Sequence, residues 1–160
     1  MANVDGLKLA GAPKQVCICG GGNAVHVMSA LTPSLLPEAK VRILSTFSDE
    51  AERWSKALAV NGCMTLDKTE HDKSKRMVKG TPALVTNDPA KAVPGSDVIF
   101  IPLPAFAHQG YLEAIGPHIA DGAVIVGMPG YPGFRWLVRK ILGAEKAAKV
   151  AVVSGETLPW

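Results

Sequence analysis

Residues 15–25 read Gln-Val-Cys-Ile-Cys-Gly-Gly-Gly-Asn-Ala-Val, and they carry the strongest structural signal of the chain. A short apolar run, residues 16–19, leads directly into three glycines, and residues compatible with a helix follow. A tight turn from a strand into a helix lets the backbone approach an anion, which then faces the N–H groups and the positive dipole end of the helix. The stretch therefore predicts a turn that binds the pyrophosphate of a dinucleotide, with a purely structural glycine turn as the alternative.

The spacing of the glycines explains the prediction. Gly20 allows the tight turn, and Gly22 lets the backbone come close to phosphate groups. The third motif position holds Val25 instead of Gly or Ala, so the motif is incomplete. The prediction therefore depends on the alternating strand–helix pattern that begins at the turn. We expect six residues of the turn to contact the cofactor: Gly20, Gly21, Gly22, Asn23, Ala24 and Val25.

Composition indicates one domain of moderate charge. The chain has 160 residues, of which 48% are hydrophobic, enough for a substantial core. Lys and Arg number 17 against 14 Asp and Glu, a net charge of +3. Residues 71–79 form the only basic concentration, and no aromatic side chains interleave it, so we expect a solvated hairpin and no nucleic-acid surface.

The sequence also indicates where the protein acts. It shows no secretory signal and no apolar run of the roughly 18 residues that a membrane span needs, so we expect no membrane association. Its three cysteines, Cys17, Cys19 and Cys63, are an odd number, which favours reduced thiols in the cytoplasm. Cys17 and Cys19 lack further ligands nearby in sequence, so we expect buried cysteines and no metal site.

Strand and helix patterns alternate along the chain. We expect six main strands at residues 16–19, 41–45, 83–86, 97–103, 123–127 and 150–153. Helices are expected at residues 23–31, 50–60, 89–93, 105–115 and 134–142, and a small hairpin between residues 63 and 78. The fold class is α/β: a doubly wound parallel sheet of the Rossmann type, with helices on both faces.

Ligands of such sheets bind beyond the carboxyl ends of the strands. After the second strand this places Thr46 and Phe47 among the cofactor-binding candidates. After the fourth strand the candidates are Pro102, Leu103, Pro104, Ala105 and Phe106.

The choice between NAD and NADP stays open from these residues. An Asp or Glu at the tip of the second strand usually binds the NAD ribose, but the tip here begins with Ser45. The first acid is Asp49, whose spacing to Glu52 predicts a helix capping box. Arg42 and Arg53 would favour the 2′-phosphate of NADP.

No residue pattern predicts catalysis by this chain. A Tyr followed four residues later by Lys, as in short-chain dehydrogenases, does not occur, and neither does a nucleophile elbow or a phosphate-binding lysine loop. His108, just after the fourth strand, is the one weak catalytic candidate, and no carboxylate is evidently placed to orient it.

Several runs resemble the N-terminal half of the opine dehydrogenase family. They are residues 16–23, 49–54, 104–108, 110–111, 125–127, 141–143 and 156–160. The resemblance implies a cytosolic NADH-dependent oxidoreductase that reductively condenses a keto acid, typically pyruvate, with an amino acid. It also implies that residues 1–160 form the dinucleotide-binding domain and that the family's C-terminal catalytic domain is absent, as in a truncated protein.

The resemblance also implies two residues of the substrate cleft. Glu156 matches a family glutamate linked to the amino-acid substrate. Tyr131 stands where the family has a glutamine associated with the keto acid, which puts the octopine-type substrate pair in doubt. The amino acid, the keto acid and the oligomeric state stay open.

The isolated chain is therefore expected to bind NADH and to be inactive, because the catalytic His–Asp pair of the family comes from the second domain. One alternative is a non-catalytic nucleotide-binding or interaction module. Another is the N-terminal domain of a glycerol-phosphate or ketopantoate-type reductase, which residues 156–160 disfavour.

Overall fold

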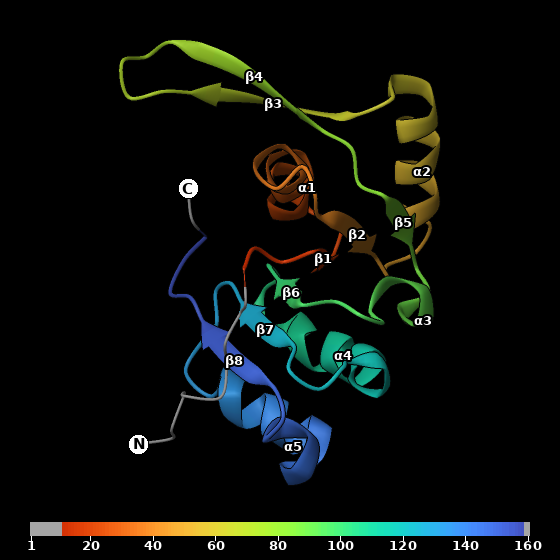
Figure 1. The fold of residues 1–160 in the computed structure, drawn as a ribbon, viewed down its shortest axis with the longest axis vertical. Coiled ribbons are helices and arrows are strands. Elements are labelled where there is room, and N and C mark those ends of the chain that lie inside the picture. Colours follow the sequence, from red (N-terminus) through yellow and green to blue (C-terminus); the bar gives the residue numbers. More distant parts are fainter. Residues whose placement is uncertain (1–10, 159–160) are drawn as a thin grey trace.

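A single parallel sheet organises the molecule in the computed structural model, which describes residues 11–158 (Figure 1). Its six strands run in the order β5-β2-β1-β6-β7-β8. The bounds are β5 Leu84–Thr86, β2 Lys40–Leu44, β1 Gln15–Cys19, β6 Val98–Ile101, β7 Val124–Gly127 and β8 Ala151–Ser154. All neighbouring pairs are parallel, so the doubly wound Rossmann fold is confirmed. The strand order changes direction between β1 and β6, which is where such sheets bind ligands.

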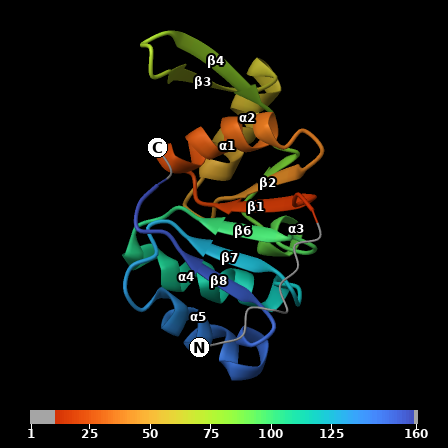
Figure 2. The same ribbon diagram turned by 60° about the vertical axis from the view of Figure 1, so that its left-hand side comes forward.

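Five α-helices cover both faces of the sheet (Figure 2). Helices α1 (Asn23–Leu35) and α2 (Glu50–Asn61) pack on one face, where Val25 and Trp54 join the hydrophobic core. Helices α3 (Pro89–Ala92), α4 (Ala105–Ile115) and α5 (Phe134–Ala147) lie over the other core, and a 3₁₀ turn (Gly116–His118) follows α4.

Strand β1 shows why the apolar runs are continuous. Val16 and Ile18 enter the core under α1 and α2, whereas Cys17 and Cys19 enter the core under α3, α4 and α5. All four side chains are fully buried, as expected for a strand that is covered on both faces. Cys17, Cys19 and Cys63 are free thiols.

The predicted hairpin consists of β3 (Met64–Thr69) and β4 (Lys75–Gly80), which pair antiparallel. Both views show it on the far side of α1 from the main sheet. At Gly80 a Cβ would stand 2.2 Å from the carbonyl oxygen of Ala30, so this glycine lets β4 lie directly on α1.

Two helices extend by a turn or more beyond their expected ends, and the strand expected at residues 97–103 is shorter, at Val98–Ile101. Helix α1 continues through Pro33 to Leu35 although Pro33 has no N–H to donate, and the N–H of Leu36 donates to the carbonyl oxygen of Thr32 at the end of the helix. Helix α5 extends to Ala147 across a break at Gly143, whose φ is 78°.

The expected capping box is also wrong. Asp49 makes no side-chain bond to the start of α2. It pairs instead with Arg53, whose Nε lies 3.0 Å from the carboxylate, and Glu52 pairs with Lys56.

Within residues 11–158, no helix combines the length and apolar character that a membrane crossing requires. The same residues contain no group of three or more His, Cys, Asp or Glu side chains that could hold a metal ion.

Candidate functional site: the glycine turn and the carboxyl edge of the sheet

The glycine turn after β1 is tied to both neighbouring strands. Gly20 has a φ of 112°, a conformation that L side chains rarely adopt. Its N–H donates to the carbonyl oxygen of Leu44 at the end of β2, across 2.7 Å. A Cβ on Gly20 would stand 2.5 Å from Cδ2 of Leu103, in the loop after β6. The turn therefore lies where the two halves of the sheet meet.

Gly22 presents an open space at the start of α1. No atom lies within 4 Å of the position that a Cβ would occupy, and Gly22 itself is exposed. It is the N-cap of α1, makes no side-chain cap and has a φ of −77°, and no acidic residue occupies the first turn. The first N–H groups of a helix lack intrahelical partners, so this end can bind an anion. The arrangement fits the pyrophosphate of a dinucleotide.

The remaining turn residues divide between surface and core. Asn23 is exposed and Ala24 half-buried at the start of α1, whereas Val25 is fully buried in the core between α1 and the sheet. The valine side chain at the third motif position therefore contributes to the packing of α1 against the sheet.

Gly21, in contrast to Gly22, is buried against a carboxylate. A Cβ on Gly21 would stand 1.9 Å from Oε2 of Glu50, the first residue of α2. The same carboxylate oxygen accepts a hydrogen bond from the Ser45 hydroxyl. Sequence reasoning considered Asp49 and missed Glu50, because nothing in the spacing reveals that the first helical residue turns back to the glycine turn.

The tip of β2 carries an exposed aromatic side chain. Phe47 is 70% exposed, and Ser48 beside it has a φ of 48°, an uncommon value for a residue other than glycine. The backbone N–H of Thr46 donates to the hydroxyl of Tyr111, on α4, across 3.2 Å. Helix α4 thus helps to fix the position of the β2 tip.

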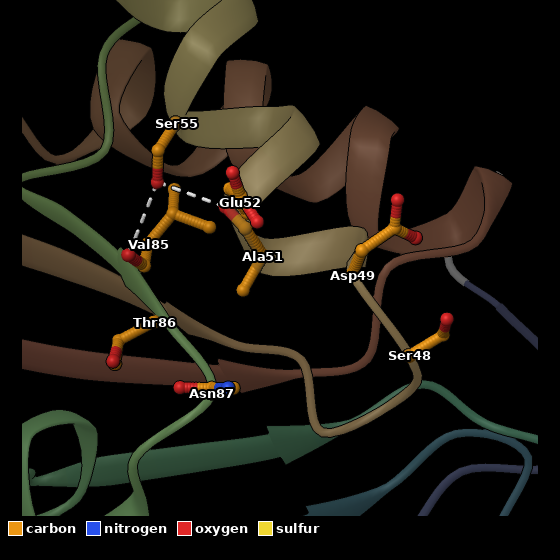
Figure 3. Close-up of a pocket in the computed structure, with 8 residues that line it drawn as sticks. All are labelled: Ser48, Asp49, Ala51, Glu52, Ser55, Val85, Thr86 and Asn87. Carbon is orange, nitrogen blue, oxygen red and sulfur yellow. Dashed lines mark hydrogen bonds between the residues drawn. The ribbon is translucent and has the colours of Figure 1, made fainter.

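Beside this tip lies a polar pocket of about 520 Å³ between the start of α2 and the end of β5 (Figure 3). Its lining residues are Ser48, Asp49, Ala51, Glu52, Ser55, Val85, Thr86 and Asn87. The Ser55 hydroxyl lies between α2 and β5 and donates to the carbonyl oxygen of Ala51 across 2.8 Å.

The loop after β6 combines buried and exposed candidates. Pro102 is buried, Leu103 half-buried, and Pro104 and Ala105 are exposed. Phe106, in the first turn of α4, is 88% exposed. Phe106 and Phe47 are thus exposed aromatic side chains at the carboxyl ends of β6 and β2.

His108 lies inside the protein, away from solvent. Only 2% of its surface is exposed, and its ring packs edge-on against Phe134 with 5.1 Å between the centroids. Its Nε2 lies 2.7 Å from the carbonyl oxygen of Leu103, to which it donates. Burial lowers the pKa of His108, and the bond to Leu103 opposes this in part. The hydrogen bond joins α4 to the loop after β6, so His108 helps to hold this loop in position.

The loops after β7 and β8 are joined by backbone hydrogen bonds. The N–H of Gly130 donates to the carbonyl oxygen of Gly155 across 2.7 Å, and that of Gly155 to Gly127 across 2.9 Å. Tyr131 and Glu156 each follow one residue later and are exposed. The structure therefore brings the two substrate-cleft candidates to the same edge of the sheet as the glycine turn.

Comparisons with known proteins agree with this architecture. No protein-family model matches the chain. It is 47% identical over 146 residues to octopine dehydrogenase of Mizuhopecten yessoensis, covering 91% of this chain and 36% of that protein. It is 43% identical over 143 residues to tauropine dehydrogenase of Arabella iricolor, covering 89% and 35%.

A solved structure of octopine dehydrogenase with NADH and L-arginine has the same fold, with a TM-score of 0.87 at 46% identity. The match covers 91% of this chain and 36% of that chain. The chain thus spans about a third of the length of the relatives it matches. The resemblance noted in the sequence is confirmed: by sequence and by fold the chain belongs to the opine dehydrogenase family, of which it matches the N-terminal, dinucleotide-binding part.

Proposed function

We infer that this chain binds NADH and serves as the dinucleotide-binding domain, residues 1–160, of an opine dehydrogenase. The observation that carries the inference is the open space at Gly22, where the uncapped start of α1 meets the exposed side of the glycine turn. The solved octopine dehydrogenase complexes, which contain NADH, support the choice of cofactor.

Each part of the cofactor has a matching surface in this proposal. The pyrophosphate lies on residues 20–25, with the N–H groups of Asn23 and Ala24 as donors. Phe47 offers a flat apolar face to the adenine. Residues 102–106 flank the nicotinamide, and the hydrogen bond from His108 to Leu103 holds this loop in shape.

The bound NADH would supply a hydride to the imine that a keto acid forms with an amino acid. Two residues of this chain would face that substrate. The Glu156 carboxylate attracts the cationic groups of an amino acid, and the exposed ring of Tyr131 limits the shape of the keto acid. Within residues 11–158, no carboxylate is hydrogen-bonded to His108. We therefore assign the acid–base step of the reaction to the part of the family's longer proteins that this chain does not match.

A nucleotide-binding module without any catalytic partner is the second candidate, because the burial of His108 leaves residues 11–158 without an evident acid–base group. The two candidates share the cofactor site and differ in whether the bound NADH takes part in a reaction.

Amide NMR spectra recorded during an NADH titration test the site. We expect the resonances of Gly22, Asn23 and Ala24 to shift, while those of the hairpin, β3 and β4, stay in place as an internal control. Shifts confined to the hairpin, or no shifts at all, would contradict the proposal.

A further inference from the structure

The carboxylate of Glu50 lies beside the glycine turn, next to Gly21 and hydrogen-bonded to Ser45. Oε2 packs against Gly21, where even a methyl group would collide with it. The same oxygen accepts a hydrogen bond from Ser45, a side chain that is 1% exposed. Glu50 is also the first residue of α2, where the positive end of the helix dipole stabilises a negative charge. The carboxylate therefore has a fixed place.

That place is the tip of β2. The backbone N–H of Ser45 donates to Thr86, so Ser45 still belongs to the end of the sheet. In dinucleotide-binding folds the ribose hydroxyls are bound at this tip by an acidic side chain. Here the tip residue is a serine, whose short side chain cannot replace a carboxylate. The serine instead positions the carboxylate of Glu50, which belongs to the next helix, α2.

The two arginines that would favour a 2′-phosphate are otherwise engaged. The guanidinium of Arg42 donates to the carbonyl oxygens of Lys91 and Pro94, 3.2 and 2.8 Å away, at the end of α3. Arg53 forms its ion pair with Asp49. The guanidinium of Arg42 is therefore held at the end of α3, and the charge of Arg53 is shared with a second carboxylate beside Glu50.

We propose that Glu50, positioned by Ser45, makes this site select NADH over NADPH. The carboxylate accepts hydrogen bonds from the ribose hydroxyls of NADH. The 2′-phosphate of NADPH adds a charge of about −1.5 to −2 at the same place and is repelled by the fixed carboxylate. A side chain at position 21 would occupy the space of that carboxylate, so the arrangement requires a glycine there. This inference rests on the proposed nucleotide site and deepens it.

The test is the ratio of the dissociation constants for NADPH and NADH, measured by calorimetric titration of the chain and three variants. Glu50→Gln keeps the shape of the side chain and removes its charge. Ser45→Ala keeps the charge and removes its anchor. Glu113→Gln is the matched control, because Glu113 is an exposed helical glutamate on α4 that accepts a hydrogen bond from Gln109 and lines no part of the candidate site.

We expect the unmodified chain to bind NADH at least about 100-fold more tightly than NADPH, and Glu50→Gln to lower this ratio by about tenfold or more, partly through tighter NADPH binding. Ser45→Ala should lower the ratio by a smaller factor, and Glu113→Gln should leave it unchanged. A role of Glu50 in stability alone would change the thermal midpoint and leave the ratio as it was.

Two results would overturn the proposal alone: an unmodified chain that binds both nucleotides equally, or a folded Glu50→Gln variant with an unchanged ratio. If Glu50→Gln fails to fold, a folded Ser45→Ala variant with an unchanged ratio also overturns it. An unmodified chain that binds no NADH overturns the proposed nucleotide site itself, and the selectivity with it.

Discussion

The imidazole of His108 and the carbonyl oxygen of Leu103 are joined by a hydrogen bond of 2.7 Å, which fixes the loop between β6 and α4. Leu103 in turn contacts Gly20 through its side chain. The histidine thus supports the glycine turn from the second half of the sheet. Because it is buried and its pKa is lowered by burial, it performs this role in its neutral form.

The stability of the protein should therefore depend on pH through His108. Its folded-state pKa lies below the unfolded value of about 6.5, so the unfolded chain takes up the proton first as the pH falls. We expect the free energy of unfolding, measured with urea, to decrease from pH 7.5 to pH 5.5. In His108→Gln, whose amide can still donate to Leu103, the decrease should be smaller. Equal slopes in the two proteins would show that His108 does not titrate in this way.

A valine at position 22 should remove cofactor binding and leave the fold intact. Gly22 has an ordinary φ and open space around its Cβ position, so Gly22→Val should lose only about 1 kcal/mol from the weaker N-cap. Its side chain would fill the space proposed for the pyrophosphate. Circular dichroism should report an unchanged fold, and titration with NADH should give no heat. Gly110→Ala, at another glycine with open space, is the matched control and should bind NADH normally.

Arg42 should contribute to stability and not to nucleotide choice. Its guanidinium bonds the carbonyl oxygens of Lys91 and Pro94, which Arg42→Met would leave without this donor. Losing such charged hydrogen bonds costs about 1.5–3 kcal/mol, measurable by urea denaturation. Arg53→Met removes only an exposed ion pair and should cost less than about 0.5 kcal/mol. A changed preference between NADH and NADPH in Arg42→Met would contradict the assignment.

The chain of 160 residues should not turn over opine substrates by itself. A positioned acid–base group contributes about 10²–10⁴-fold to such reactions, and His108 is buried and already bonded to a carbonyl group. The assay follows NADH oxidation in the presence of pyruvate with arginine, taurine, alanine or glycine. We expect the background rate. Substrate-dependent oxidation would make His108 a catalytic candidate again.

Much of the fold could be predicted from the sequence because its signals are local. Residues 16–19 are apolar on both faces, and the glycines that follow favour a tight turn before a helix. The short helix α3 was also predictable: Asp88 accepts a hydrogen bond from the N–H of Ala90, as its place before Pro89 indicates.

What could not be predicted depends on contacts between distant elements. The spacing of Asp49 and Glu52 suits a capping box, yet both carboxylates form ion pairs with basic side chains one turn further along α2. The interaction of Glu50 with Gly21 and Ser45 depends on how α2 packs against the glycine turn. The burial of His108 likewise depends on Phe134, which begins a different helix.

Every functional proposal for this chain depends on the binding of NADH at its glycine turn. Isothermal titration of the purified chain with NADH measures this binding, with Gly22→Val as the blank. We predict a dissociation constant in the micromolar range, a binding free energy of about 5–8 kcal/mol, and weaker binding of NADPH. The absence of heat with NADH, or clearly tighter binding of NADPH, would contradict the account.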